Sequence, residues 1–438
     1  MIIGKTKSVC PVCLRVLDAQ KRSEKDGIYL DKRCDEHGAF SALIWEGNLA
    51  SYLRWNSENT AVDPPREGRA PEKGCPGDCG LCTEHLRKGC CMLLELTRRC
   101  NLRCPVCFAG AGEETSGDLS RAEIEKQYDY LMAHGGPFNI QLSGGEPTVR
   151  DDLPEIIRMG REKGFPFFQL NTNGLRLAAE PGYARALKEA GLNTVFLQFD
   201  ALNDSVYITL RGRSLLAEKR RCIDACAKAG LGIVLVPVIA RGVNEDQVGP
   251  ILRFALEKAP AVRGVHFQPL SYFGRCGLER PARPITIPKL LSLIEAQTEG
   301  LMRASDFHGG GAESAYCSFH ASYRIRPDGT LKCLPRRQSS GCCTNSDDSR
   351  TSVADQWSGA VPDFGEDDPL TETSSLDAFL EQARRRTFAV SGMVFQDAWN
   401  LDLERLRRCH ICEVDSRYGM VPFCAYNLTN QEGEALYR

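Results

Sequence analysis

The chain has 438 residues, which exceeds a usual single domain and favours one large domain with smaller additions. Its 55 Lys and Arg nearly balance its 57 Asp and Glu, which argues against nucleic acid or an anionic membrane as the main partner. The 21 cysteines occur in Cys-x2-Cys and Cys-x3-Cys clusters, which is typical of metal ligands and differs from the dispersed cysteines of a secreted scaffold.

The N-terminus has no apolar segment of the kind that directs secretion. The longest apolar stretch, residues 233–240, contains Pro237 and is too short to span a bilayer. We therefore expect a soluble, cytoplasmic, oxygen-sensitive protein of anaerobic metabolism with no transmembrane segment.

Residues 1–48 carry Cys10-Pro-Val-Cys13 and Cys34-Asp-Glu-His37. A Cys-x2-Cys pair followed by Cys-x2-His is the spacing of a small ribbon in which two turns hold one tetrahedral ion. Zinc is the default ion, and a mononuclear iron fits comparable ligands. His37 has an alternative role as the turn residue of a His-Gly pair.

Residues 49–90 combine a polar linker with a cysteine loop, Cys75-Pro-Gly-Asp-Cys79-Gly-Leu-Cys82. Three cysteines in eight residues, separated by Gly and Pro, indicate a loop folded around an auxiliary [4Fe-4S] cluster. Cys90 or Cys91 is a candidate fourth ligand, and the alternative for either is a buried thiol at the start of a strand.

The most informative motif is Cys100-Asn-Leu-Arg-Cys104-Pro-Val-Cys107, which follows an apolar run. Three thiolates at this spacing hold three irons of a [4Fe-4S] cluster and leave the fourth iron open to chelate S-adenosylmethionine. The motif resembles that of the radical S-adenosylmethionine superfamily, whose members generate a 5'-deoxyadenosyl radical. A zinc knuckle or a group of buried thiols is the alternative reading of the three cysteines alone.

Residues 91–300 alternate between strand-like and helix-like segments. Apolar runs predict strands at 92–96, 138–142, 165–170, 194–199, 233–239 and 265–270. Amphipathic patterns predict helices at 121–132, 153–162, 183–190, 216–229 and 247–258. Six such units predict an α/β fold, a partial (βα)6 TIM-like barrel with parallel strands, as the resemblance also implies.

Active residues of a parallel barrel belong at the C-terminal ends of its strands. Gly144-Gly145-Glu146-Pro147 ends the second predicted strand, and the resemblance implies that this motif receives the methionine amino group. We expect its glycines to let the backbone approach the ligand closely.

Further contacts to S-adenosylmethionine are expected from other strand ends. Asn171 and Asn173 are candidates for the ribose hydroxyls, and Gln198 or Asp200 for the ribose or the methionine moiety. Arg211 is a candidate for the methionine carboxylate, because a guanidinium holds a carboxylate through two parallel hydrogen bonds. Phe108 is expected to pack beside the cluster and the adenine. Each of these side chains also has a plain structural role as its alternative.

Residues 301–438 are expected to form a C-terminal auxiliary iron-sulfur domain that resembles SPASM and twitch domains. Four of its five candidate ligands would bind a cluster, for a total of one or two auxiliary clusters, and the fifth would face the substrate as a hydrogen-atom or proton donor. The candidates are Cys317, Cys333, Cys409, Cys412 and Cys424. Residues 338–375 are poor in large apolar residues and predict a mobile surface insertion, in which Cys342 and Cys343 bind nothing.

Taken together, the cysteine motifs resemble the branch of the superfamily that contains the archaeal tetraether lipid synthase and the methanopterin-associated radical methylases. The resemblance implies C–C bond formation at an unactivated carbon, either by coupling lipid chains or by C-methylation of a small molecule, with an electron donor such as flavodoxin or ferredoxin. A peptide-modifying maturase with a SPASM-type tail and a non-enzymatic multi-metal electron carrier are the alternatives.

Overall fold

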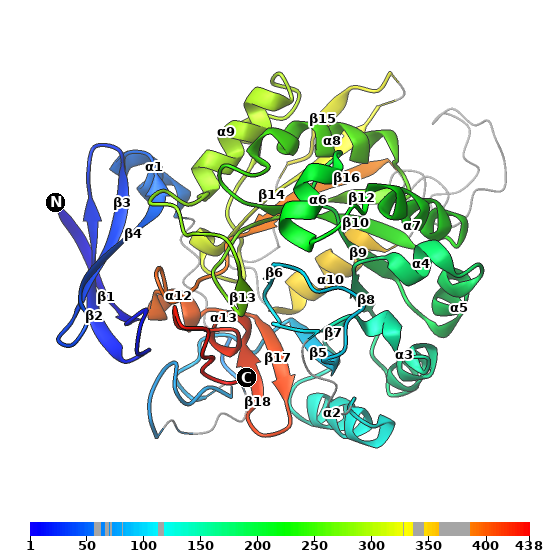
Figure 1. Cartoon of the computed structure of the whole chain (residues 1–438), viewed down its shortest axis with the longest axis horizontal. Helices are drawn as coiled ribbons and strands as arrows, with labels where there is room; N and C mark the ends of the chain where they lie inside the picture. The colour runs from blue at the N-terminus through cyan, green and yellow to red at the C-terminus, as the bar shows by residue number, and fades with distance from the viewer. Residues whose placement is uncertain are drawn as a thin grey trace.

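The structure is a computed structural model, and it describes residues 1–56, 63–65, 70, 72–80, 82–112, 118–326, 328–335, 346–358 and 386–438. Figure 1 shows an antiparallel N-terminal sheet beside a large α/β body. None of the helices in these ranges is both long and apolar enough to cross a membrane.

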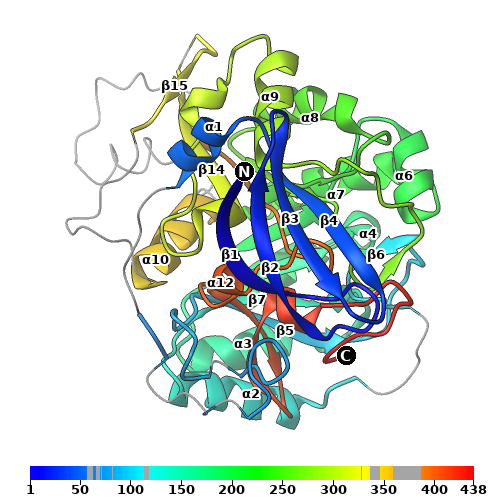
Figure 2. The same ribbon diagram turned by 90° about the vertical axis from the view of Figure 1, so that its left-hand side faces the viewer.

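The N-terminal sheet consists of four antiparallel strands in sequence order. They are β1 (Ile2–Val9), β2 (Val16–Ser23), β3 (Gly27–Cys34) and β4 (Gly38–Glu46), and helix α1 (Leu49–Trp55) follows them. Figure 2 shows this sheet in front of the body, close to the C-terminal segment. The buried Lys32 anchors the two parts, because its Nζ donates to the carbonyl oxygen of Ala398 at 2.6 Å.

The body is built on six parallel strands that are neighbours in the order of the sequence, which confirms the predicted barrel. They are β5 (Cys91–Thr97), β7 (Asn139–Gly144), β8 (Phe168–Thr172), β9 (Thr194–Gln198), β10 (Gly232–Val236) and β12 (Val262–Pro269), and β11 (Val238–Ile239) pairs with the end of β12. Such nearly continuous apolar strands are buried on both faces. A short pair, β6 (Val106–Cys107) with β13 (Arg275–Cys276), closes over the cysteine loop.

Helices connect the strands and cover the outside of the barrel (Figure 1). They are α2 (Arg121–Ala133), α3 (Leu153–Glu162), α4 (Leu175–Ala179), α5 (Tyr183–Ala190), α6 (Asp204–Arg211), α7 (Leu216–Lys228), α8 (Val248–Glu257) and α9 (Ile287–Gln297). Helix α2 begins at a capping box, in which the Ser120 side chain accepts from the Glu123 backbone and the Glu123 side chain accepts from the Ser120 backbone. Four 3-10 turns lie between these elements, η1 (Pro147–Val149), η2 (Glu245–Gln247), η3 (Ala304–Asp306) and η4 (Ala315–Cys317).

The chain after residue 300 extends the barrel sheet at both edges. At one edge β16 (Thr387–Met393) pairs parallel to β12, and β14 (Ser318–Ile325) and β15 (Leu331–Cys333) follow antiparallel. At the other edge β17 (Ile411–Asp415) pairs parallel to β5 and antiparallel to β18 (Gly419–Pro422), near the short helices α12 (Leu403–Leu406) and α13 (Phe423–Tyr426). The described strands of the C-terminal segment therefore share one continuous sheet with the barrel.

Part of the segment expected to be a surface insertion is the helix α10 (Ser346–Trp357). Its Trp357 is buried, and the indole lies 4.8 Å from the ring of Phe196 and 5.8 Å from that of His266, measured between ring centroids. The prediction of a surface insertion is wrong for this helix, because Val353, Ala354 and Trp357 form one apolar face that packs on the barrel. Cys342 and Cys343 lie outside the described residues.

Candidate active site and metal centres

The turns of the N-terminal sheet bring four metal-binding side chains together. The ligand atoms of Cys10, Cys13, Cys34 and His37 all lie within 4.8 Å of one another. The Nδ1 atom of His37 is 3.4 Å from the Cys34 sulfur and 3.7 Å from the Cys10 sulfur. Such spacings fit the edges of a tetrahedral zinc site. His37 therefore lies with the three cysteines and is more than the turn residue of a His-Gly pair.

The inner face of the barrel encloses a cavity of about 890 Å³. This volume lies near the top of the range of roughly 300–1,000 Å³ that is usual for small-molecule sites. Cys100, Cys104 and Cys107 line the cavity from the loop after β5. Burial raises the pKa of the Cys100 thiol to about 12, so its thiolate needs a cation as partner. Three thiols converging on one cavity fit the open [4Fe-4S] cluster.

The two glycines of the Gly144-Gly145-Glu146-Pro147 motif are required by packing against the strand that leads into the cysteine loop. A Cβ atom on Gly144, where φ is +112°, would lie 2.4 Å from the carbonyl oxygen of Thr97. A Cβ atom on Gly145 would lie 2.2 Å from that of Arg99. We expected these glycines to admit the ligand, and the structure shows that they also admit the backbone of this neighbouring segment.

The carboxylate of Glu146 joins this motif to the end of β8. Its Oε1 atom accepts from the hydroxyls of Thr148 and Thr172, both at 2.7 Å, and from the Thr148 amide at 3.1 Å. Its Oε2 atom accepts from the amide of Asn173 at 2.7 Å. Glu146 lines the cavity but is only 1% exposed, so it holds two strand ends in register. Pro147 begins the η1 turn behind it.

Asn173 and Gln198 line the cavity next to the cysteine loop. The Asn173 amide donates to the side chain of Asn101 at 2.7 Å, which links it to the cluster loop. Lys219, which no sequence motif indicated, donates from Nζ to the Asn173 carbonyl at 2.7 Å and to Gln198 Oε1 at 3.3 Å. Burial lowers the pKa of Lys219 to about 8. Lys219 therefore positions Asn173 and Gln198, the two predicted cofactor contacts that line the cavity here.

Asp200 and Arg211 form a buried ion pair. Two nitrogens of the guanidinium donate to the two carboxylate oxygens at 2.7 and 2.8 Å, and its third nitrogen donates to the carbonyl oxygen of Val106 at 2.9 Å. Asp200 is fully buried and does not line the cavity, so the geometry does not fit the predicted ribose contact. We expected the guanidinium of Arg211 to bind the methionine carboxylate. In the structure it instead hydrogen-bonds to Asp200 and to the carbonyl oxygen of Val106 in the cysteine loop.

Phe108 lines the cavity directly after the cysteine triad and is 37% exposed. Its ring lies 5.6 Å from that of Phe423, measured between centroids, on a C-terminal helix that the sequence did not connect with this site.

Cys75, Cys79 and Cys82 occupy one loop that packs against the C-terminus. The thiol of Cys75 and burial raise the pKa of Cys79, and the Cys79 amide donates to the Tyr437 hydroxyl at 2.8 Å. The predicted fourth ligand, Cys90, lies elsewhere. It lines the cavity, and after burial its pKa is raised chiefly by Cys91 and Glu313. Cys90 therefore lies in the wall of the cavity that the cysteine triad also lines.

Three of the five C-terminal cysteines gather beside α12. Burial and the charges of Cys409 and Cys317 raise the pKa of Cys424. Arg405 donates to the Cys317 sulfur at 3.4 Å. The buried Cys412 lies beside these three cysteines. Burial raises its pKa, and the charge of Cys409 raises it further.

Cys333 is separate from this group. It ends β15, and its thiol contacts the carbonyl oxygen of Leu334 at 3.7 Å. Its charged neighbour is Asp306. The hairpin of β14 and β15 carries Cys333 to the far edge of the sheet, away from the cysteines beside α12.

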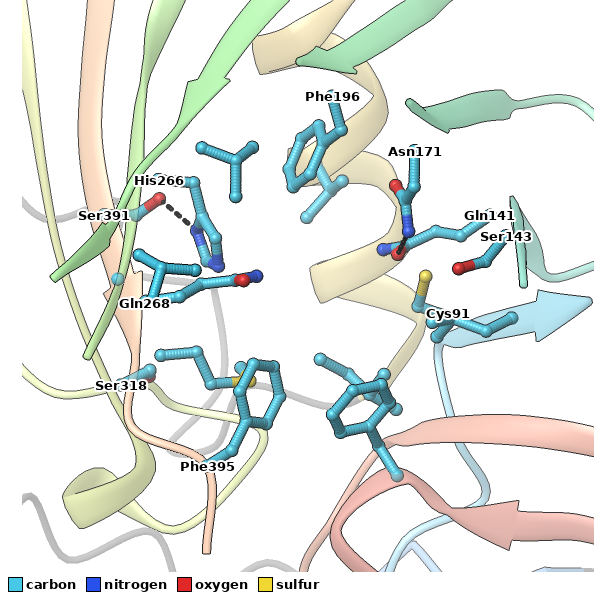
Figure 3. Close-up of a pocket in the computed structure, with 18 of the residues that line it drawn as sticks. Cys91, Gln141, Ser143, Asn171, Phe196, His266, Gln268, Ser318, Ser391 and Phe395 are labelled. Carbon is cyan, nitrogen blue, oxygen red and sulfur yellow. Dashed lines mark hydrogen bonds between the residues drawn. The ribbon is translucent and has the colours of Figure 1, made fainter. Parts of the chain in front are cut away.

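The walls of the cavity beyond the cysteine triad carry polar side chains, and apart from the predicted cofactor contact Asn171 no motif in the sequence marked those that Figure 3 labels. Figure 3 shows Gln141, Ser143 and Asn171 on one side and His266, Gln268 and Ser391 on the other. These residues alternate with core residues along β7, β8, β12 and β16. A polar side chain at every second position of an otherwise apolar strand was the only available signal.

Comparison with known proteins agrees with this geometry. The model of the radical SAM superfamily matches residues 94–255, and that of the HMPTM N-terminal zinc ribbon domain matches residues 2–46. A 7,8-dihydro-6-hydroxymethylpterin dimethyltransferase of Methanocaldococcus jannaschii is 31% identical over 98% of this chain and 94% of its own length. A probable GTP 3',8-cyclase of Methanothermobacter thermautotrophicus is 31% identical over 58% of this chain and 86% of its own length.

Among solved structures, SuiB of Streptococcus suis bound to S-adenosylmethionine has a TM-score of 0.41 and 17% identity, covering 48% of this chain and 47% of that chain. The nearly full-length match and the two family models agree on one assignment. The chain belongs to the radical SAM superfamily and, within it, to the family of the Methanocaldococcus jannaschii 7,8-dihydro-6-hydroxymethylpterin dimethyltransferase.

Proposed function

We propose that this protein is a radical S-adenosylmethionine methyltransferase that forms a C–C bond at a carbon of a reduced pterin. The observation that carries the proposal is the cavity that the cysteine triad lines together with polar and aromatic side chains. The nearly full-length likeness to a pterin dimethyltransferase supports the substrate class. A pterin and the guanine of GTP share a 2-amino-4-oxopyrimidine ring, so the GTP 3',8-cyclases point to the same chemistry.

Different residues of the chain would hold the cluster and position the strand ends that face the cofactor. Cys100, Cys104 and Cys107 would hold the cluster, which supplies one electron to S-adenosylmethionine and so yields a radical able to take hydrogen from an unactivated carbon. Glu146 and Lys219 hold the strand ends that face the cofactor. Buried walls exclude water, which protects a reactive intermediate from side reactions.

The chemistry of the cavity wall favours a small heterocycle over the alternatives. Amides, hydroxyls and imidazoles recur along both sides, such as those of Gln141, Ser143 and His266. A lipid chain would leave the cavity-facing donors and acceptors of these groups unsatisfied, which costs about 1–3 kcal/mol for each buried one. We therefore place coupling of lipid chains and modification of a peptide behind methylation of a pterin.

The remaining cysteines are proposed to bind auxiliary [4Fe-4S] clusters. One set is Cys75, Cys79 and Cys82, and the other is Cys317, Cys409 and Cys424 with Cys412 beside it. Such clusters would carry electrons between the substrate and an external donor such as flavodoxin or ferredoxin, in the cytoplasm of the cell.

The proposal is tested with anaerobically reconstituted, reduced protein, S-adenosylmethionine, 6-hydroxymethyl-7,8-dihydropterin and a cell extract that supplies one-carbon donors. Mass spectrometry should find 5'-deoxyadenosine together with a pterin product heavier by one or two methylene units. Isotopic labelling of each possible carbon source identifies the origin of the new methyl group. The Cys104→Ala variant should give neither product. Formation of 5'-deoxyadenosine by the wild type while the pterin stays unchanged would refute the substrate class.

A further inference from the structure

Three side-chain amides form a chain of hydrogen bonds across β8 and β7 on the inner face of the barrel. Gln169 Nε2 donates to Asn171 Oδ1 at 3.0 Å, and Asn171 Nδ2 donates to Gln141 Oε1 at 3.3 Å. Gln169 is fully buried and lies in register with Gln141 on the neighbouring strand. The chain of hydrogen bonds starts at the buried Gln169 and ends at Asn171 and Gln141, which line the cavity (Figure 3).

The direction of this chain of hydrogen bonds decides whether the wall presents hydrogen-bond donors or acceptors to the cavity. The carbonyl oxygen of Gln141 is occupied by Asn171, so its amino group is the free end of the chain. One hydrogen of this group points toward the thiol of Cys91, a weak acceptor, and the side chain of Ser143 lies beside it (Figure 3). This wall therefore presents hydrogen-bond donors to a ligand.

The opposite wall has the complementary character. His266 Nδ1 lies 2.9 Å from the Ser391 hydroxyl, with which it is in register across β12 and β16. Burial keeps the imidazole neutral by lowering its pKa to about 4. We assign His266 the tautomer in which Nδ1 donates to the Ser391 hydroxyl, which makes Nε2 the acceptor. Gln268, two residues later, lies on the same face of the strand and also lines the cavity.

Aromatic rings close the space between the two walls. The ring of Phe196 lies 5.6 Å from that of His266 and 4.8 Å from that of Trp357, measured between centroids. A flat ligand would lie against this surface, with its two edges facing the two polar walls.

We propose that Gln141, oriented by Gln169 and Asn171, and His266, oriented by Ser391, are the specificity-determining residues that read the two edges of the pterin ring. This inference rests on the proposed function. A 7,8-dihydropterin carries two adjacent acceptors, the 4-oxo oxygen and N5, which match the donors of Gln141 and Ser143. Its 2-amino group and N3–H are donors, which match His266 and Gln268.

The test measures two affinities of anaerobic, reconstituted protein by fluorescence titration, one for 6-hydroxymethyl-7,8-dihydropterin and one for S-adenosylmethionine. The quantity compared between variants is the ratio of the pterin affinity to the S-adenosylmethionine affinity. Gln141→Leu should lower this ratio about tenfold, as the loss of one buried hydrogen bond predicts. Gln141→Glu, which replaces the donor by an acceptor of the same shape, should lower it at least as much. Gln127→Leu makes the same change on the buried side of α2, outside the cavity, and should leave the ratio at the wild-type value.

The second wall is tested with the analogue that carries an oxo group in place of the 2-amino group. Wild type should prefer the pterin by about tenfold or more, and His266→Phe should lose most of this preference. Equal ratios for wild type and both Gln141 variants would overturn the inference, even if wild type methylates the pterin. If the variants lose binding as expected but the wild type never methylates the bound pterin, the proposed function is overturned and this inference stands.

Discussion

The ion pair between Arg211 and Asp200 supports a quantitative prediction, because both side chains are almost completely inaccessible. Their side chains are 4% and 0% exposed. Arg211→Met removes both bonds to Asp200 and the bond to Val106, and it leaves a buried carboxylate with the amide of Val238 as its described donor. Removing one partner of a buried pair costs about 3–5 kcal/mol, because the charge left behind is uncompensated. We expect a loss of this size in the free energy of unfolding.

The measurement is urea unfolding of anaerobic, reconstituted protein, followed by circular dichroism. Arg185→Met is the matched control, since its ion pair with Glu189 has side chains that are 79% and 62% exposed. Breaking such a surface pair costs at most about 1 kcal/mol. The double variant Asp200→Asn with Arg211→Met should lose less than Arg211→Met alone, because no unpaired carboxylate is left buried at position 200. A loss for Arg211→Met no larger than for Arg185→Met would refute the reasoning.

Three further predictions concern separate parts of the molecule. His37→Ala should weaken zinc binding, as measured by chelator competition, because three ligands are left; an unchanged affinity would exclude His37 as a ligand. Gly145→Ala should reduce iron content, because its Cβ would lie 2.2 Å from the Arg99 carbonyl oxygen, whereas Gly4→Ala, with a nearest contact of 3.9 Å, should not. Burial lowers the pKa of His266 from 6.5 to about 4. Between these two pH values the folded state therefore binds fewer protons than the unfolded state. Wild type should therefore lose about 3 kcal/mol of stability relative to His266→Phe as the pH falls from 7 to 4, and parallel pH profiles would contradict this.

Local patterns predicted much of the fold. The helices expected at 153–162 and 183–190 are α3 and α5 with the same bounds, because amphipathic periodicity is encoded within about ten residues. The superfamily, the fold class, the [4Fe-4S] cluster with S-adenosylmethionine and the N-terminal zinc ribbon are confirmed. The individual cofactor contacts and the ligands of the auxiliary clusters stay predictions.

The sequence by itself determined the six barrel strands, five of the helices around them and the cysteine triad, since each of these depends on neighbours along the chain. Only the tertiary structure decided that Arg211 faces Asp200, that Cys90 faces the cavity and that α10 covers the barrel. These placements depend on contacts between distant segments, as between Glu95 and Arg438, which are 343 residues apart and whose side chains meet at 2.6 Å. Periodicity shows which face of a segment is buried, but the partner of that face is settled only when all segments pack together.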